Sequence, residues 1–322
     1  MLRQKNKGDI VVEDVVAKIQ KRRFLSFEFV PATGGIEAQI AALQASGIMQ
    51  KIDAIVCTDS PRACLKMSPI LASIKLQQTL QKPVICTLSM RDRNSLALQA
   101  ELLGANTFDL RLFLALTGDP VHLGDQPQSK GVFEGSSKLL LKIIDRLNCG
   151  TDLQGKPLKC AQQRIYPLCV MNAFAKPLEK LKAAIRNKIQ NGICAIITQP
   201  VYERDTAQTL LQWVAEANHE LGRNATLIFG FYPITTFKGA CFLHKNLPGM
   251  SIPHFWLQKL ESAHFAGKEH ERAEGVRMSQ ELFAELWNLQ QCVHFMSSSH
   301  LKIAKEILCE NFCDSPQNLS KT

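Results

Sequence analysis

The hydrophobic pattern of the chain consists of short apolar runs separated by longer stretches with helical periodicity. Eight runs are almost continuously apolar rather than alternating, which is typical of strands buried on both faces of a parallel sheet. The runs are 24–31, 53–59, 83–90, 110–120, 166–173, 193–201, 226–234 and 292–299. Segments such as SSKLLLKIIDRL and TAQTLLQWVAEANHEL repeat their apolar residues at helical spacing between these runs. The alternation predicts an α/β protein.

Eight strands with helical crossovers predict a single-domain (β/α)₈ TIM barrel. The alternative is an open doubly wound sheet, but its phosphate fingerprint G-x-G-x-x-G is absent, and PATGGIEA follows the first run instead. We expect a helical N-terminal extension over 1–23, the barrel over 24–310 and a flexible tail over 311–322. The polar stretch 262–275 is expected to form an irregular insertion before the last helix.

The formal net charge of +9 raises the question of a nucleic-acid partner. The basic residues are scattered over amphipathic segments, and the denser runs at 3–7 and 18–23 lack interleaved aromatic residues. We therefore expect a solvated basic surface and no nucleic-acid partner. The same excess of positive charge could attract an anionic ligand.

The chain has 11 cysteines but no C-x-x-C pair. Several lie inside the apolar runs, where a free thiol packs as a small hydrophobe. We expect free cysteines and no metal site, since Cys309 and Cys313 in the tail are a weak signal. No apolar leader and no apolar run of about 18 residues is present. These features predict a cytoplasmic protein without a membrane partner.

Active sites of (β/α)₈ barrels lie at the C-terminal ends of the strands. Polar residues at the ends of the predicted strands are therefore candidates for the chemistry. They are Glu28, Thr58, Asp59, Asp92, Asn94, Asp119, Asn172 and Gln199.

Glu28 stands between two phenylalanines in an apolar run, where a carboxylate is rarely found without a purpose or a partner. It is either a general acid or a structural carboxylate paired with a barrel cation. Asp119 in LTGDP can also be a turn residue, and Gln199 can pair with an amide-like heterocycle or with a loop. For Asp92 we favour a cap on the helix that begins near Ser95, with flanking arginines as anion contacts.

SFEFVP, TGD, ITQPVY and GFYPITTFKGA occur in an order and spacing that resembles methylenetetrahydrofolate reductases over residues 24–300. TLSMRDRNSLALQAELLGA and NAFAKPLEKL are similar to one branch of that family. The branch contains the reductase halves of bifunctional homocysteine-methyltransferase proteins and the reductase subunits of acetogenic bacteria. The resemblance implies a TIM barrel that carries a flavin and converts 5,10-methylenetetrahydrofolate to 5-methyltetrahydrofolate in one-carbon and methionine metabolism.

The resemblance also implies residue roles. Glu28 matches the catalytic acid that protonates the folate, and Asp119 matches an aspartate beside flavin and pterin that is both catalytic and substrate-binding. Gln199 matches the glutamine that binds the pterin. Thr58 and Lys188 match flavin-binding positions. The remaining cofactor-binding candidates are Thr87, Asp92 and Asn172.

Several positions depart from the better-known relatives. Thr87, Thr117, Leu168 and Leu181 stand where those enzymes hold FAD with His, Arg, Tyr and Asp, and Leu243 replaces a stacking aromatic residue. The cofactor can therefore be FMN, FAD held differently, or no flavin at all, with hydride transferred directly. If a flavin binds, FMN is expected to bind at least as well as FAD. The reductant is NAD(P)H or another donor, such as a partner protein, and a methyltransferase partner is also possible.

Two other functions stay open. The chain can be a folate-binding or accessory subunit of a methyl-transfer complex without catalysis of its own. A barrel lyase or aldolase is the third reading, but no lysine suited to a Schiff base lies at a strand end. The sequence leaves the oligomeric state open.

Overall fold

The structure, a computed structural model, describes residues 11–173, 178–246, 250–296 and 300–310. Eight parallel strands follow one another around a closed barrel, and the eighth pairs with the first. This confirms the predicted TIM barrel, and each apolar run overlaps one strand. The strands are β1 (Arg23–Phe29), β2 (Ala54–Cys57), β3 (Val84–Ser89), β4 (Leu112–Leu116), β5 (Tyr166–Met171), β6 (Ala195–Pro200), β7 (Thr226–Phe231) and β8 (Gln291–Phe295).

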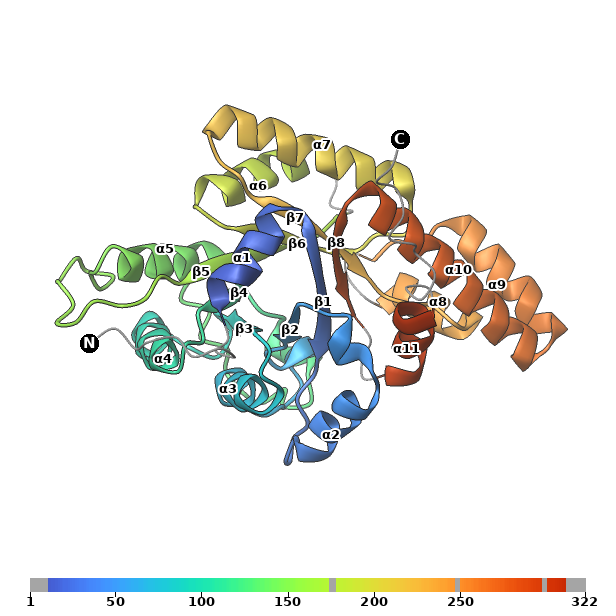
Figure 1. The fold of residues 1–322 in the computed structure, drawn as a ribbon, viewed down its shortest axis with the longest axis horizontal. Coiled ribbons are helices and arrows are strands. Elements are labelled where there is room, and N and C mark those ends of the chain that lie inside the picture. The colour runs from blue at the N-terminus through green and yellow to red at the C-terminus, as the bar shows by residue number, and fades with distance from the viewer. Residues whose placement is uncertain (1–10, 174–177, 247–249, 297–299, 311–322) are drawn as a thin grey trace, which may run out of the picture.

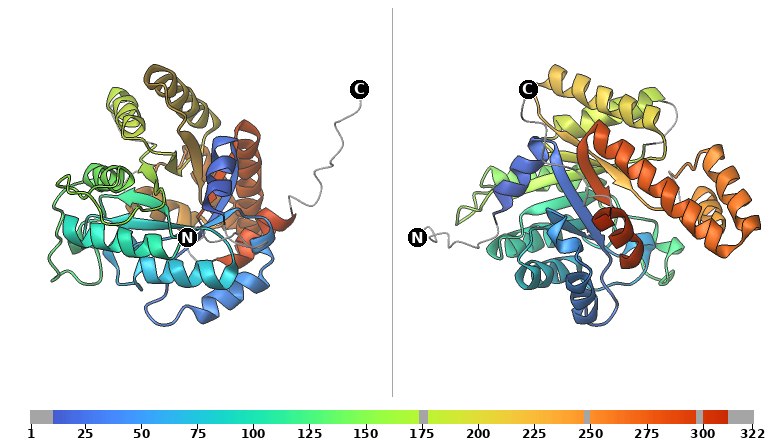
Figure 2. Two further views of the ribbon diagram at one scale, coloured as in Figure 1. Left: turned by 60° about the vertical axis from the view of Figure 1, so that its left-hand side comes forward. Right: turned by 45° about the vertical axis from the view of Figure 1, so that its right-hand side comes forward.

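Helices surround the barrel, and α9 and α10 extend outward from the ring on one side (Figures 1 and 2). Three short 3₁₀ helices lie in connecting loops: η1 (Ile48–Gln50), η2 (Pro61–Ala63) and η3 (Val121–Leu123). The α-helices are α1 (Val12–Gln20), α2 (Glu37–Ala45), α3 (Pro69–Leu80), α4 (Ser95–Thr107), α5 (Ser137–Asn148), α6 (Leu178–Gln190), α7 (Arg204–Leu221), α8 (Phe237–Asn246), α9 (His254–Ala266), α10 (Lys268–Leu289) and α11 (Leu301–Glu310).

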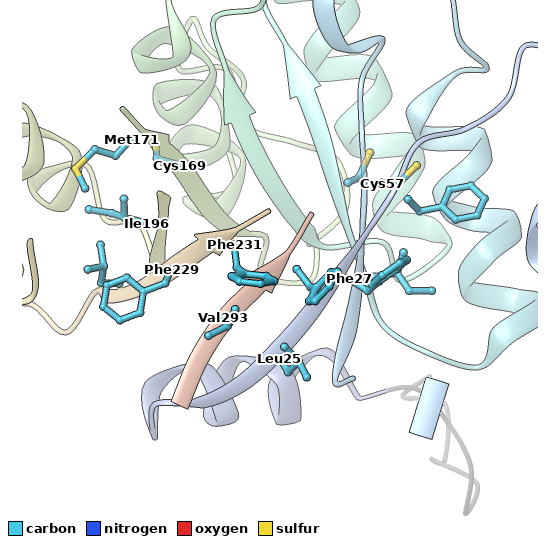
Figure 3. Close-up of a cluster of buried hydrophobic side chains, with 14 of the residues drawn as sticks. Leu25, Phe27, Cys57, Cys169, Met171, Ile196, Phe229, Phe231 and Val293 are labelled. Atoms are coloured by element: carbon cyan, nitrogen blue, oxygen red, sulfur yellow. The ribbon is translucent and has the colours of Figure 1, made fainter. Parts of the chain in front are cut away.

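Alternate residues of each strand serve two separate cores. Inward-facing side chains such as Val56, Ile85 and Ile228 fill the barrel, whereas outward-facing side chains pack under the helices. Phe27 of β1 and Phe295 of β8 are stacked in the outer core with ring centroids 5.9 Å apart. Figure 3 shows Phe27 close to other outward-facing residues of these strands. This aromatic packing holds β1 and β8 firmly beside each other.

Helix α1 closes the N-terminal end of the barrel. Its buried residues Val12, Val15, Val16 and Ile19 recur at helical spacing and pack onto the inner core. The hydroxyl of Thr226 donates to the carbonyl of Ile19 at 2.9 Å, which ties the end of the helix to β7. The barrel is thereby sealed at this end.

The predicted irregular insertion over 262–275 is wrong. Helix α9 continues to Ala266 and α10 begins at Lys268, so only Gly267 interrupts the helical backbone. Gly267 has φ +120°, a conformation that suits glycine. The stretch is polar because much of it lies on exposed helix surface. The nine cysteines whose side chains the structure describes are free, as predicted.

Candidate functional site

Glu28 lies near the C-terminal end of β1 and faces the barrel interior. It is directly opposite Val56 of β2, and Val56 belongs to the inner core. Paired residues of neighbouring strands point to the same face of the sheet, so Glu28 shares that direction. Its side chain is half-buried. The strand therefore presents this carboxylate at the end of the barrel where such folds hold their active sites.

A cavity of about 480 Å³ opens beside Glu28. The segment after β7 and helices α8 and α11 provide most of its walls, with apolar side chains from Phe242, Leu243 and Ile303. Arg62, from the loop after β2, also lines it. The cavity thus combines an apolar wall with a carboxylate and a guanidinium.

The loop that carries Arg62 has an unusual backbone. Ser60, Arg62 and Ala63 all have positive φ, at 43°, 56° and 55°. The Arg62 amide donates to Oδ2 of Asp119 at 2.7 Å, and the Leu65 amide donates to a carboxylate oxygen of Asp125 at 2.9 Å. Two carboxylates of the loop after β4 therefore hold the loop after β2 in this conformation.

Asp119 is exposed and follows a glycine that the local packing requires. Gly118 has φ +97°, and a Cβ there would lie 2.7 Å from the Cβ of Arg91. The close approach of the two loops fixes where the Asp119 carboxylate points. The structure thus gives Asp119 a contact that orders the loop of Arg62, while its proposed roles toward folate and flavin stay predictions.

The interpretation of Asp92 as a helix cap is wrong. The side chain of Asn94 caps α4 by accepting from the Ala97 amide at 2.9 Å. The exposed Asp92 instead receives hydrogen bonds from Nε and Nη2 of Arg91, and this contact raises the pKa of Arg91. The third guanidinium nitrogen, Nη1, donates to the carbonyl of Ser60 at 3.0 Å. Arg91 thus braces the same strained loop.

Gln199 lies at an irregularity in the sheet. The pairing of β6 with β7 shifts between Ile197 and Pro200, so β6 carries one extra residue there. A Cβ on Gly230 would meet the Thr198 carbonyl oxygen at 2.1 Å, so the shifted strand requires glycine as its neighbour. Such bulges often redirect side chains near active sites.

Three other residues predicted to bind a cofactor lie on or just after strands. Thr87 is buried on β3 and registers with the inner-core residue Leu114, whereas Thr58 follows β2 and donates from its amide to Phe29 at 3.0 Å. Asn172 is exposed directly after β5. These strand-end residues share one end of the barrel with Glu28.

Lys188 is the exception. It lies on α6 and lines a separate cavity of about 170 Å³ with Ser136, Ser137 and Lys138. The structure therefore does not bring Lys188 to the cavity of Glu28.

Two positions chosen for their departures from FAD-binding relatives are buried leucines. Leu168 is 0% exposed within the inner core of the barrel, and Leu181 is 3% exposed in the outer core. Neither lines the cavity of Lys188 or that of Glu28. The structure thus gives neither leucine a contact with these cavities, and the expectation that FMN binds at least as well as FAD stays a prediction.

Ser26 and His294 form a buried polar pair one side-chain layer below Glu28. Ser26 Oγ and His294 Nδ1 are 3.0 Å apart, and the two residues register between β1 and β8. Burial lowers the pKa of His294 to about 3, so the imidazole is neutral at physiological pH. The charge on this side of the barrel therefore comes from Glu28 rather than from the histidine.

The residues present fit a flavin nucleotide in two places. Ser89 Oγ, at the end of β3, is buried without a hydrogen-bond partner among the described residues, so a bound polar group there would satisfy it. Lys188 and the hydroxyls of Ser136 and Ser137 line one cavity, which suits a phosphate. Ser89 lies at the end of β3, whereas the second cavity lies between α5 and α6.

Arg62, Ser89 and His294 were not predicted from sequence. Positive φ at three non-glycine positions within four residues has no simple sequence signal, so the reach of Arg62 into the cavity was hidden. The basic and turn-forming residues of TDSPRA were visible, but their direction was not. In the sequence, Ser89 and His294 are ordinary members of apolar runs, and nothing marks them as site residues.

The closed parallel barrel and the cavity beside Glu28 define a TIM barrel with a candidate site at the C-terminal ends of its strands. The sequence profile of the methylenetetrahydrofolate reductase family matches residues 12–311. The chain therefore belongs to the methylenetetrahydrofolate reductase family. No match was found among curated proteins.

Solved structures share the fold at low sequence identity. One is described as an uncharacterized protein from Clostridium thermocellum that binds two copies of 5-methyl-5,6,7,8-tetrahydrofolic acid. It has a TM-score of 0.59 and 17% identity, covering 91% of this chain and 98% of that one. EDTA monooxygenase from Chelativorans sp. BNC1 has a TM-score of 0.54 and 9% identity, covering 91% and 95%.

Within the part of the chain that the structure describes, no helix is long and apolar enough to cross a membrane. Among the same residues, no group of three or more His, Cys, Asp and Glu side chains is arranged to hold a metal ion.

Proposed function

We propose that this protein reduces 5,10-methylenetetrahydrofolate to 5-methyltetrahydrofolate, with Glu28 as the general acid. The observation that carries the proposal is the half-buried Glu28 carboxylate, which faces inward from β1 beside a cavity of about 480 Å³. Membership of the reductase family supports the reaction class. The folate bound by the Clostridium thermocellum protein of the same fold supports the substrate class.

Glu28 would donate a proton to the nitrogen that leaves when the five-membered ring of the substrate opens. A positioned acid of this kind typically accelerates such a step by about 10²–10⁴-fold. The apolar wall formed by Phe242, Leu243 and Ile303 would exclude water from the reacting groups. Gln199 would hold the pterin by paired hydrogen bonds, and Asp119 would offset positive charge that develops on it.

Bound flavin, as FAD or FMN, would supply the hydride, and NAD(P)H or another reductant would restore it. Thr58, Thr87, Asp92 and Asn172 would contribute contacts near the strand ends, as would Lys188 toward a phosphate. Polar groups at these positions would orient the cofactor against the substrate.

The test is a spectroscopic titration of purified protein reconstituted with FMN or FAD. Addition of 5-methyltetrahydrofolate under anaerobic conditions should bleach the flavin absorbance near its visible maximum, because the reaction runs in reverse. The product of that reverse step, 5,10-methylenetetrahydrofolate, should be recovered in equal amount. Tight folate binding without bleaching would contradict the reductase.

The second candidate is a folate-binding or accessory subunit without catalysis. The folate bound by the Clostridium thermocellum protein of the same fold supports it, since folate binding alone requires no catalysis. In the same titration this candidate predicts folate binding by calorimetry and no change in flavin absorbance. A partner protein that supplies electrons or accepts the methyl group would then be sought by co-purification.

A further inference from the structure

We infer that Arg62 is the specificity residue that binds the glutamate carboxylates of the folate substrate. The inference rests on the proposed function and names the part of the ligand that this residue recognises. Arg62 and Glu28 line the same cavity but come from different strand-end segments. A ligand that reaches both residues must carry a basic or proton-accepting centre and an anionic group.

The backbone conformation that places Arg62 at the cavity is strained. Ser60, Arg62 and Ala63 have positive φ, and a left-handed conformation costs non-glycine residues about 1–2 kcal/mol each. Strain of this size persists only where surrounding contacts impose it, and it is concentrated at ligand sites. Here the Asp119 and Asp125 carboxylates bind amides of the strained segment.

Packing against the neighbouring loop also holds the segment. A Cβ on Gly124 would lie 2.0 Å from the carbonyl oxygen of Ala63, so only glycine allows the two loops to approach this closely. Arg91 adds a hydrogen bond to the Ser60 carbonyl at 3.0 Å. Several independent contacts therefore fix the base of the Arg62 side chain.

The Arg62 guanidinium is available to an anion. None of the described Asp or Glu side chains forms an ion pair with it. Its carbon lies 5.9 Å from the centroid of the Phe242 ring, a cation–π distance. The side chain is exposed, so the charge meets solvent at the cavity mouth.

The wall beside Arg62 suits an aromatic group next to the anion. Phe242, Leu243, Met250 and Ile303 line this cavity with Glu28 and Arg62. Folates consist of a pterin, an aminobenzoyl ring and a glutamate in that order. With the bridging nitrogen at Glu28, the aminobenzoyl ring lies along the apolar wall and the glutamate extends toward Arg62. The planar guanidinium matches a carboxylate in two hydrogen bonds.

The test is a binding cycle by isothermal titration calorimetry on the full-length protein. One ligand is 5-methyltetrahydrofolate, and the other is its diamide, in which both glutamate carboxylates are carboxamides. The variant is Arg62→Asn, because asparagine tolerates the left-handed backbone while it removes the charge. Arg223→Asn, at an exposed site before β7 and so at the opposite end of the barrel, is the matched control.

We expect Arg62→Asn to weaken binding of 5-methyltetrahydrofolate by about tenfold to a hundredfold, as for a hydrogen bond to a charged group. Binding of the diamide should stay within about twofold, and Arg223→Asn should change neither. Arg62→Lys should recover part of the loss, because it restores charge but not the planar pair of donors.

Equal losses for the acid and the diamide would overturn the inference, since Arg62 would then act only on the shape of the site. Unchanged binding of both ligands would also overturn it. So would a loss confined to NAD(P)H when that ligand is titrated in the same way, because the guanidinium would then bind a phosphate of the reductant. Absence of any folate binding by the unmodified protein would instead contradict the proposed function itself.

Discussion

The N-terminal and C-terminal ends of the barrel differ in their packing and in their polar contacts. At the N-terminal end, α1 inserts four apolar side chains beneath the inner core, and the buried Arg111 bridges Glu13 of α1 and Asp109 before β4. At the C-terminal end, Glu28 faces a cavity, Ser89 keeps an unsatisfied hydroxyl and the loop of Arg62 is strained. Apolar contacts and ion pairs close the N-terminal end, whereas a cavity and an unsatisfied serine hydroxyl lie at the C-terminal end. Left-handed non-glycine residues occur at both ends, since Arg22, Gln81 and Asp109 precede strands.

This difference suggests that residues at one end mainly stabilise the fold and residues at the other mainly bind the ligand. Apolar burial and closed ion pairs stabilise the fold, whereas an unsatisfied polar group reduces stability and is kept where a ligand can use it. Substitutions at the sealed end should therefore change the free energy of unfolding with little effect on turnover. Substitutions at the open end should do the reverse.

The largest effect is expected at the open end, from Glu28→Gln. The amide is close in shape but cannot donate the proton, so folate turnover should fall by about 10²–10⁴-fold. The melting temperature should stay within a few degrees, and exchange of electrons between donor and flavin should continue. Stopped-flow measurement of the two half-reactions checks this. Full folate turnover by the variant would remove Glu28 from the chemistry.

At the sealed end, Ile19→Ala should reduce the free energy of unfolding by about 2–5 kcal/mol. Ile19 is 0% exposed beneath the inner core, and truncation leaves a cavity there. The exposed neighbour Gln20→Ala is the control and should change stability by less than about 0.5 kcal/mol. Urea unfolding gives both values. A fall in turnover at temperatures where Ile19→Ala is fully folded would show that the two ends are coupled.

Most of the barrel could be predicted from sequence because its strands are buried on both faces. Continuous apolar runs such as 193–201 and 226–234 identified them without knowledge of tertiary contacts. The prediction failed over 262–275, where charged residues on exposed helices were read as a loop. The sealing role of α1 was also hidden, since an amphipathic helix does not reveal what it covers.

The site could be predicted in part for a similar reason. Glu28 was visible because a carboxylate interrupts an apolar strand, and the alternation of the strand gives its direction. Arg62 was hidden because positive φ depends on contacts with Asp119 and Gly124 from a distant segment.

The buried His294 should make the free energy of unfolding depend on pH. Its folded-state pKa of about 3 lies below the ordinary value of 6.5, so the unfolded chain binds a proton first as the pH falls. The stability contributed by the neutral imidazole is complete above about pH 6.5 and is lost toward pH 3. Between pH 6.5 and 4.5 the resulting loss in the free energy of unfolding is about 2–3 kcal/mol.

The variant His294→Asn keeps a polar partner for Ser26 but cannot titrate. Its free energy of unfolding should therefore fall less steeply with acidity than that of the unmodified protein, although it starts from a lower value. Chemical unfolding at several pH values between 4.5 and 7 measures the two slopes. Identical slopes would mean that the imidazole accepts its proton without unfolding the barrel.

The smallest expected changes in stability come from substitutions of Asn94 and Asp92, which are neighbours at the open end. Asn94→Ala removes the hydrogen bond to the Ala97 amide and should cost about 1 kcal/mol of stability, as is usual for a helix N-cap. Asp92→Ala removes only an exposed contact with Arg91 and should cost less, because the Arg91 bond to the Ser60 carbonyl persists. Thermal unfolding of both variants, measured side by side at pH 7, gives the comparison. A larger cost for Asp92→Ala would mean that Asp92 holds Arg91, and through it the strained loop of Arg62, more firmly than its exposure indicates.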